Sequence, residues 1–201
     1  RCDALGFSVA VHAIEREAVE LAASVFLAAR PLLRGRIEHC AECPPALAER
    51  LAQANVQVVS NPGFVYHRGE RYLAAVPLET LPYLYPARTL LEAGVSLAAG
   101  SDAPVAPAEP LLGIYAAVTR MSLASRPVAP EQAVTAQQAL DMHTLAAARA
   151  CYRERDFGSI TPRKLADLVL LSQDPMGMEP EALKAIRVAM TMVGGEVVWE
   201  E

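Results

Sequence analysis

The sequence predicts an α/β fold that is followed by a small unit of β structure. Between residues 7 and 99, short β-branched runs alternate with longer stretches whose apolar residues recur at helical spacing. After Tyr152 this spacing ends and β-rich runs replace it. Strands that alternate with helices imply a parallel sheet with right-handed crossovers. Two units are therefore expected, residues 1–152 and residues 153–201.

The first unit is expected to contain four strands, each followed by helical or loop segments. Pro31 should end the first helix, Pro44 and Pro45 should open the second, and Gly94 is a suitable C-cap for the third. Because prolines and glycines recur between residues 61 and 86, this segment is expected to be rich in loops. The expected strands are 7–11, 36–39, 57–60 and 95–99, and the expected helices are 14–30, 46–54, 87–93, 111–123 and 130–151.

Four such units correspond either to half of an eight-stranded barrel or to a small doubly wound sheet, and periodicity leaves both open. The tail contains three β-rich runs, at 168–171, 186–193 and 197–199. Gly194 and Gly195 predict a hairpin turn between the last two runs.

Composition limits the class of protein. With 201 residues, 53% hydrophobic and 20% charged, the chain should fold around a sizeable core. A net charge of -5 gives no basic surface for nucleic acid. No run approaches the ~20 apolar residues that span a bilayer, and no signal peptide pattern is visible, so a cytoplasmic location is expected. Because the chain begins at Arg1 close to a strand-like run, it reads as part of a longer protein.

The four cysteines are too sparse for a disulfide scaffold. Cys40 and Cys43 form a C-x-x-C pair, which raises a zinc or redox hypothesis. A structural zinc site usually needs a second pair, and none is present in the sequence. We therefore expect these two thiols to have no metal or redox role.

Polar residues stand at the ends of three predicted strands. His12 follows FSVAV, His39 ends RIEH, and Asp102 follows VSLAAGS. In parallel α/β folds, the carboxyl ends of strands line the active site. Imidazole nitrogens and a carboxylate are suitable ligands for zinc or a similar divalent ion. The alternative is that each is an ordinary packed, hydrogen-bonded side chain.

Longer blocks around these residues resemble a known family. The segments FSVAVHAI, RIEHC and GVSLAAGSDAPVAPAEPLLGIYAAVTR are similar to the amidohydrolase superfamily, and in particular to amidohydrolase family 3. The tail segments GSITPRKLADLVLLSQDPM and MTMVGGEVVW are similar to the closing part of that group. The resemblance extends from about residue 6 to residue 199.

The resemblance implies the C-terminal half of a (β/α)8 barrel, strands 5 to 8, together with part of a β-sandwich. It implies that His12 and His39 end strands five and six as metal ligands. Asp102 would end strand eight, where it would bind metal and act as general base. One or two divalent ions are expected, zinc first, with iron or manganese as alternatives. The implied reaction is hydrolysis of an amide or another C–N bond of a small-molecule substrate by metal-activated water.

The sequence also departs from the family pattern. The His-x-His pair of the first strand and the bridging ligand of the fourth strand are not found in it. The family motif His-Ala-Ile-Gly-Asp-Arg-Ala reads HAIEREA here, with Glu15, Arg16 and Glu17 at the changed positions. The expected partner is therefore the N-terminal half of the barrel or a further copy of the chain. A second hypothesis is a non-catalytic fragment or pseudoenzyme scaffold that pairs with another chain.

Other polar residues have weaker claims. His67 and Arg120 are candidates for substrate contact, although His67 could equally be an exposed loop residue and Arg120 could pair with a nearby carboxylate. His143 is expected near a helix C-terminus, where the helix dipole favours it without any function. Asp167 is expected to be structural. Ser101 has no G-x-S-x-G around it, which argues against a serine nucleophile.

Overall fold

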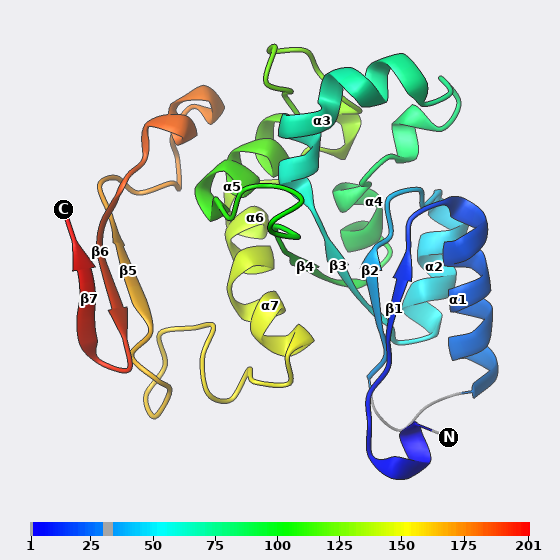
Figure 1. Ribbon diagram of the computed structural model, residues 1–201, viewed down its shortest axis with the longest axis horizontal. Helices are drawn as coiled ribbons and strands as arrows, with labels where there is room; N and C mark the ends of the chain where they lie inside the picture. The colour runs from blue at the N-terminus through cyan, green and yellow to red at the C-terminus, as the bar shows by residue number, and fades with distance from the viewer. Residues whose placement is uncertain (1, 30–33) are drawn as a thin grey trace.

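The strands of the first unit pair in the order in which they occur along the chain (Figure 1). The computed structural model describes residues 2–29 and 34–201. All three pairings in the order β1-β2-β3-β4 are parallel. A doubly wound sheet would reverse its strand order at a switch point, whereas a barrel keeps it. The α/β prediction is confirmed, and the order is that of four consecutive barrel strands. The strands are β1 (Ala10–Ala13), β2 (Arg36–His39), β3 (Gln57–Ser60) and β4 (Ser96–Ala99).

β2 and β3 begin and end where the sequence predicts, whereas β1 is shifted toward the C-terminus. Its pairing starts at Ala10, opposite Arg36, because β2 does not extend further back. Phe7 and Val9 precede the strand and are exposed. His12 therefore lies within β1, next to its last residue, and does not follow the strand as expected.

Helices cover the sheet and bury their apolar faces against it. In α1, Val19, Ala22, Ala23 and Phe26 are buried at the spacing of one helix face. The predicted end of this helix at Pro31 lies outside the described residues. The expected helix 130–151 is divided at Thr144, whose φ and ψ of -121° and -92° are not helical. These helices are α1 (Arg16–Ala29), α2 (Pro45–Gln53), α4 (Ala87–Glu92), α5 (Pro110–Thr119), α6 (Ala136–His143) and α7 (Leu145–Ala150).

The prediction of a loop over residues 61–86 is wrong for its first half. Residues Pro62–Ala75 form α3, a helix of 14 residues. Pro62 occupies the first turn, where the missing N–H has no helical partner anyway. At Gly69, α3 passes close to the segment that follows α5, since a Cβ atom there would lie 2.5 Å from Ser122 Cβ. Pro62 and Gly69 are residues that often interrupt a helix, but at these positions both are compatible with α3.

The tail forms a small β unit with a hairpin between its last two strands, as predicted, and all its strand pairings are antiparallel. Gly194 and Gly195 both have positive φ, which the tight turn between β6 and β7 requires. Asp167 accepts a hydrogen bond from the Gly194 N–H at 2.8 Å, a structural role as expected. The strands are β5 (Leu168–Leu171), β6 (Val188–Val193) and β7 (Glu196–Glu200). Short 3-10 helices complete the fold at Asp3–Leu5, Leu81–Tyr83, Pro130–Gln132 and Pro180–Ala185.

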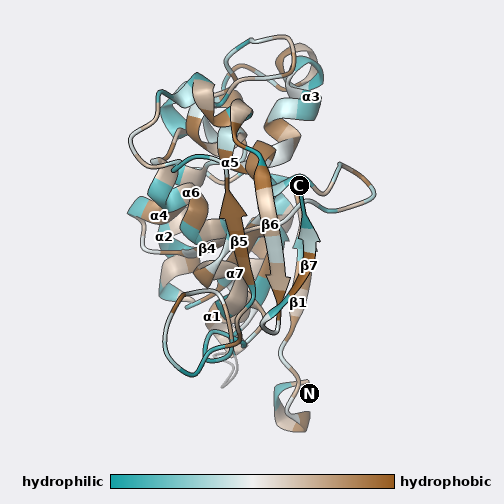
Figure 2. Cartoon of the chain, turned by 90° about the vertical axis from the view of Figure 1, so that its left-hand side faces the viewer, coloured by the Kyte–Doolittle hydropathy of each residue, from teal (hydrophilic) through white to brown (hydrophobic). Residues whose placement is uncertain are grey.

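The small sheet is hydrophobic in Figure 2, most clearly along β5. The exposed apolar side chains of this sheet are Val169, Leu170, Val193, Val197, Val198 and Trp199. The 3-10 helix Pro180–Ala185 connects the tail to α5, where Leu183 and Ile186 pack against Tyr115. The division of the chain at residue 152 stays a prediction. None of the helices in the described part of the chain combines the length and the apolarity that crossing a bilayer requires.

Candidate active site

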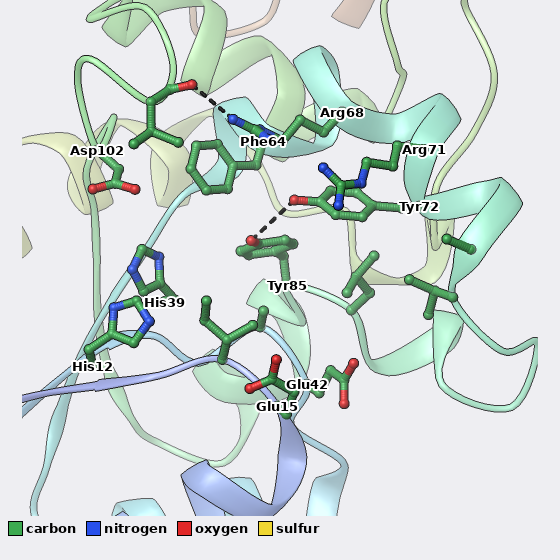
Figure 3. A pocket seen from close by; sticks show the side chains of 16 residues that line it. His12, Glu15, His39, Glu42, Phe64, Arg68, Arg71, Tyr72, Tyr85 and Asp102 are labelled. Atoms are coloured by element: carbon green, nitrogen blue, oxygen red, sulfur yellow. Dashed lines mark hydrogen bonds between the residues drawn. The ribbon is translucent and has the colours of Figure 1, made fainter.

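A cavity of about 430 Å³ opens beside the carboxyl ends of the parallel strands (Figure 3). Parallel strands present their carboxyl ends at one edge, so residues far apart in sequence meet there. His12, His39 and Asp102 all line this cavity. The structure thus brings together the three residues that the sequence proposed as ligands.

His12 and His39 lie side by side on neighbouring strands. Their ring centroids are 4.6 Å apart and the ring planes meet at 72°. His12 is exposed, while His39 is only 7% exposed. His39 and Cys40 have φ values of 72° and 50°, in the left-handed region that non-glycine residues seldom adopt. The Cys40 N–H donates to Ala13 O at 2.9 Å and holds this turn in place.

A hydrogen-bonded chain fixes the tautomer of His39. Asn61 Nδ2 donates to the carbonyl of Gly100 at 3.0 Å, so Asn61 Oδ1 faces the imidazole. That oxygen lies 2.6 Å from His39 Nδ1. Because Oδ1 can only accept, Nδ1 carries the proton and Nε2 keeps a free lone pair. Metal-binding histidines are commonly oriented in this way by a second hydrogen bond.

Asp102 reaches the cavity from the loop after β4. Its φ is 58°, and Gly100 N donates to Ser60 O at 2.9 Å, which extends the pairing of β3 and β4 up to this loop. Ser101 Oγ accepts the Ala103 N–H at 3.2 Å, a local turn contact. In residues 2–29 and 34–201, no group of three or more His, Cys, Asp or Glu side chains is close enough to hold one ion. The donors are of the right chemistry for zinc, but this part of the chain does not form a complete cage.

One face of α3 forms the wall opposite the histidines. Phe64, Arg68, Arg71, Tyr72 and Ala75 line the cavity. Their spacing along the helix is four, three, one and three residues, which places them on one face. The sequence analysis missed these residues because it treated the segment as a loop. Their helical spacing was the signal that could have found them.

Two tyrosines meet on this wall. The hydroxyl oxygens of Tyr72 and Tyr85 are 3.3 Å apart. Burial raises the pKa of both phenols, so both remain protonated near neutral pH. Tyr85 has a φ of 45°, and its N–H donates to Ala41 O at 2.7 Å.

Arg120 does not reach the cavity. It is 1% exposed, and its guanidinium donates to the carbonyl oxygens of Val128, Tyr85 and Leu84 at 3.1, 3.0 and 2.8 Å. Burial lowers the pKa of Arg120 to about 10. The structure therefore places Arg120 behind the cavity wall, where it holds the backbone at Leu84 and Tyr85. That placement does not support the predicted contact with substrate.

His67 also lies elsewhere. It lines a separate cavity of about 240 Å³ together with Ser101 and His143. His143 ends α6, as expected, where it is half-buried, and its Nε2 is buried without a hydrogen-bond partner in the described part of the protein. Burial lowers the pKa of His143 to about 4. Substrate contact by His67 stays a prediction, and the site would have to extend to this second cavity.

Cys40 and Cys43 are buried in the main core as free thiols. The pKa of the Cys40 thiol is raised well above its usual value, mainly by a hydrogen bond with Cys43 and secondly by burial. A neutral thiol is a poor nucleophile and a poor metal ligand, which argues against such a role for Cys40. Both side chains pack in the core, and the absence of a metal or redox role for the pair stays a prediction.

Comparison with known proteins identifies the family. Residues 1–199 match the amidohydrolase family, and the chain belongs to it. It is similar to the N-substituted formamide deformylase of Arthrobacter pascens, with 31% identity over 100% of this chain and 38% of that protein. The chain spans 35% to 38% of the length of the curated relatives it matches.

Solved structures agree with this assignment. An uncharacterized metal-dependent hydrolase from Pyrococcus horikoshii is 27% identical, with a TM-score of 0.77 over 89% of this chain and 36% of that one. A second, from Pyrococcus furiosus, is 30% identical, with a TM-score of 0.74 over 86% of this chain and 35% of that one. The fold is thus that of part of an amidohydrolase barrel.

Proposed function

We propose that this chain supplies the ligands His12 and His39 and the general base Asp102 to a metal-dependent hydrolase that cleaves amide or related C–N bonds. The observation that carries the proposal is that the rings of His12 and His39, whose centroids are 4.6 Å apart, line the same cavity as Asp102. The similarity to a deformylase and to metal-dependent hydrolases supports it.

The donor set suits a divalent ion, and zinc best. His12 and His39 Nε2 would hold it, with the free lone pair of His39 directed by Asn61, and the Asp102 carboxylate in the same cavity would serve as the base. When bound, such an ion supplies Lewis acidity, which activates water near neutral pH and polarises a carbonyl. The remaining ligands would come from another segment or another copy of the chain, since the described residues do not complete the cage.

The protein's own residues have distinct tasks in this reaction. An Asp102 carboxylate oxygen takes a proton from the attacking water and returns it to the departing amine nitrogen. The carboxylate lies in an exposed loop, where it stays close to solvent until a substrate enters. Phe64 and Tyr85 are 6% and 4% exposed, and they provide the apolar wall that excludes water from a bound amide.

The alternative is a non-catalytic scaffold that pairs with another chain. The incomplete cage within the described residues favours it. A hydrolase should contain metal and turn over substrate, whereas a scaffold should do neither. Both properties can be measured on the same preparations.

The test is metal content of the purified chain by plasma mass spectrometry. The variants are the double change His12→Ala with His39→Ala, and His67→Ala as the control from the neighbouring cavity. Zinc near one equivalent in the wild type and in His67→Ala, lost in the double variant, is the expected result. No metal in the wild type, or equal metal in the double variant, would overturn the proposed site and leave the scaffold. In a complete enzyme, Asp102→Asn should lower kcat by at least ~100-fold, and unchanged turnover would remove the base role.

A further inference from the structure

The cavity carries positive charge at one end. Arg68 and Arg71 are one turn apart on α3, and both line the cavity on the side away from His12 (Figure 3). No ion pair engages either guanidinium in the described part of the chain. Two cations on one helix face repel each other, so a counter-anion between them would be stabilising.

Arg68 is held in position by the protein. Its Nη2 donates to Val105 O at 3.0 Å, and its Cζ lies 5.2 Å from the centre of the Phe64 ring. Arg71 is exposed, and its side chain makes no hydrogen bond within residues 2–29 and 34–201. One guanidinium is thus fixed at the wall, and the other has all its donors available.

Two neutral donors stand beside the arginines. The paired hydroxyls of Tyr72 and Tyr85 lie on the same wall. Burial raises the pKa of Tyr72 most strongly, while the charges of Arg68 and Arg71 lower it. Arg68 and Arg71 lie beside the tyrosine pair in the cavity (Figure 3). Two guanidinium groups and two phenolic hydroxyls form a set of donors that matches a carboxylate.

The acidic residues of the cavity lie elsewhere. Glu15 and Glu42 are together on the side formed by β1 and β2, away from the arginines (Figure 3). Glu42 Oε2 accepts the backbone N–H of Arg16 at 3.3 Å. Asp102 lies near the histidines and is assigned to the reacting bond. Apolar side chains, among them Ile14, Leu84 and Val105, also line the cavity.

We propose that Arg68 and Arg71, with Tyr72 and Tyr85, bind a carboxylate group of the substrate, so that the substrate class is an amide that carries an acid, such as an N-acylated amino acid. The inference rests on the proposed function for the position of the amide bond at His12, His39 and Asp102. The arginines then determine specificity and do not take part in the bond cleavage.

The test compares two probes that differ by one charge, N-benzoylglycine and its neutral amide, N-benzoylglycinamide. Their binding to the metal-free chain is measured by isothermal titration calorimetry at low salt. The wild type should bind the acid at least ~10-fold more tightly than the amide. Arg71→Gln, and the double change with Arg68→Gln, should reduce this ratio toward one. The control is Arg155→Gln, at an exposed arginine outside the cavity, which should keep the wild-type ratio.

A charge-reversal variant distinguishes a lost carboxylate site from a misfolded protein, because it should gain binding of a cation. Arg71→Glu should bind N-(2-aminoethyl)benzamide, a cation of similar shape, more tightly than N-benzoylglycine, with an unchanged circular dichroism spectrum. Equal binding of acid and amide by the wild type, no binding of the acid, or a preference that survives the double change would each overturn the carboxylate site. Because binding is read without metal, its failure is separate from that of the proposed function. If the chain binds zinc but shows no preference for the acid probe, only the carboxylate site is wrong. If it prefers the acid probe but binds no zinc, only the proposed hydrolase function is wrong.

Discussion

His39 Nδ1 lies 2.6 Å from Asn61 Oδ1, and this contact joins the end of β2 to the residue that opens α3. The amide of Asn61 is oriented in turn by Gly100, at the end of β4. Three elements of the sheet edge therefore determine which nitrogen of one imidazole faces the cavity. A histidine held in this way needs no rearrangement before it binds an ion, which lowers the cost of ordering the site.

Asn61→Ala should weaken zinc binding by about 10- to 100-fold, the usual effect of losing such a supporting contact. Without Oδ1, His39 can change tautomer and orientation. The affinity is measured by competition with a chromophoric chelator. Asn61→Asp retains an acceptor for His39 and should stay within about threefold of the wild type. Equal weakening by both changes would show that the Gly100 contact, and not the tautomer, matters.

Two glycines of the same helix should respond in opposite directions to alanine. Gly69→Ala places a Cβ 2.5 Å from Ser122 Cβ and 3.0 Å from Val128 Cγ2, and should lower the free energy of unfolding by about 1–3 kcal/mol. Gly63→Ala meets no atom within 4 Å and should be neutral or stabilising by up to ~1 kcal/mol. Urea unfolding checks both. A neutral Gly69→Ala would mean that α3 can move away from residue 122 without loss.

Arg120→Lys should be strongly destabilising although it keeps the charge. The lysine ammonium cannot reach the three carbonyls that the guanidinium fork holds at 2.8 to 3.1 Å. We expect a loss of about 3 kcal/mol in the free energy of unfolding. Arg88→Lys removes a single contact, to Ala133 O at the surface, and should cost about 0.5 kcal/mol or less. Similar losses in the two variants would exclude the assigned role of Arg120.

The stability of the chain should fall in acid partly through His143. Burial lowers the folded-state pKa to about 4 from an ordinary value of 6.5, so the unfolded chain takes up the proton first. The loss begins as the pH falls below 6.5 and is complete near 4, with at most about 3 kcal/mol from this group. His143→Leu should flatten this part of the pH profile of unfolding. The comparable change His67→Leu, at a half-buried histidine, should leave the His143 contribution in place.

Much of the fold follows from local patterns that the sequence displays openly. Val58 and Ile37 are fully buried in two runs that were predicted as strands, and the buried face of α1 has the expected spacing. Gly194 and Gly195 mark a turn that needs positive φ at both positions. The start of β1 was less predictable, because it depends on where the neighbouring β2 begins and not on Phe7 or Val9.

The candidate site was predictable only in part. His12, His39 and Asp102 could be found because parallel strands gather their ends at one edge. Asn61 could not, because its contacts with His39 and Gly100 are tertiary, and the cavity face of α3 was missed because prolines and glycines outweighed its helical spacing. Arg120 shows the opposite case. The sequence offered it as a candidate for substrate contact, but its side chain is fully buried.

The two sides of α3 have a consequence for redesign. Gly69 and Glu70 attach the helix to the segment around Ser122, since Glu70 accepts hydrogen bonds from Ser122 Oγ and from Ala124 N. Arg68 and Arg71 project from the other side into the cavity. One inserted residue between the anchor and Arg71 would rotate the downstream part by about 100° and turn Arg71 away from the cavity, with the helix intact. The length of this helix is therefore more tightly constrained than its composition, and libraries that alter ligand preference should vary the side chains at 68, 71 and 75 at fixed length.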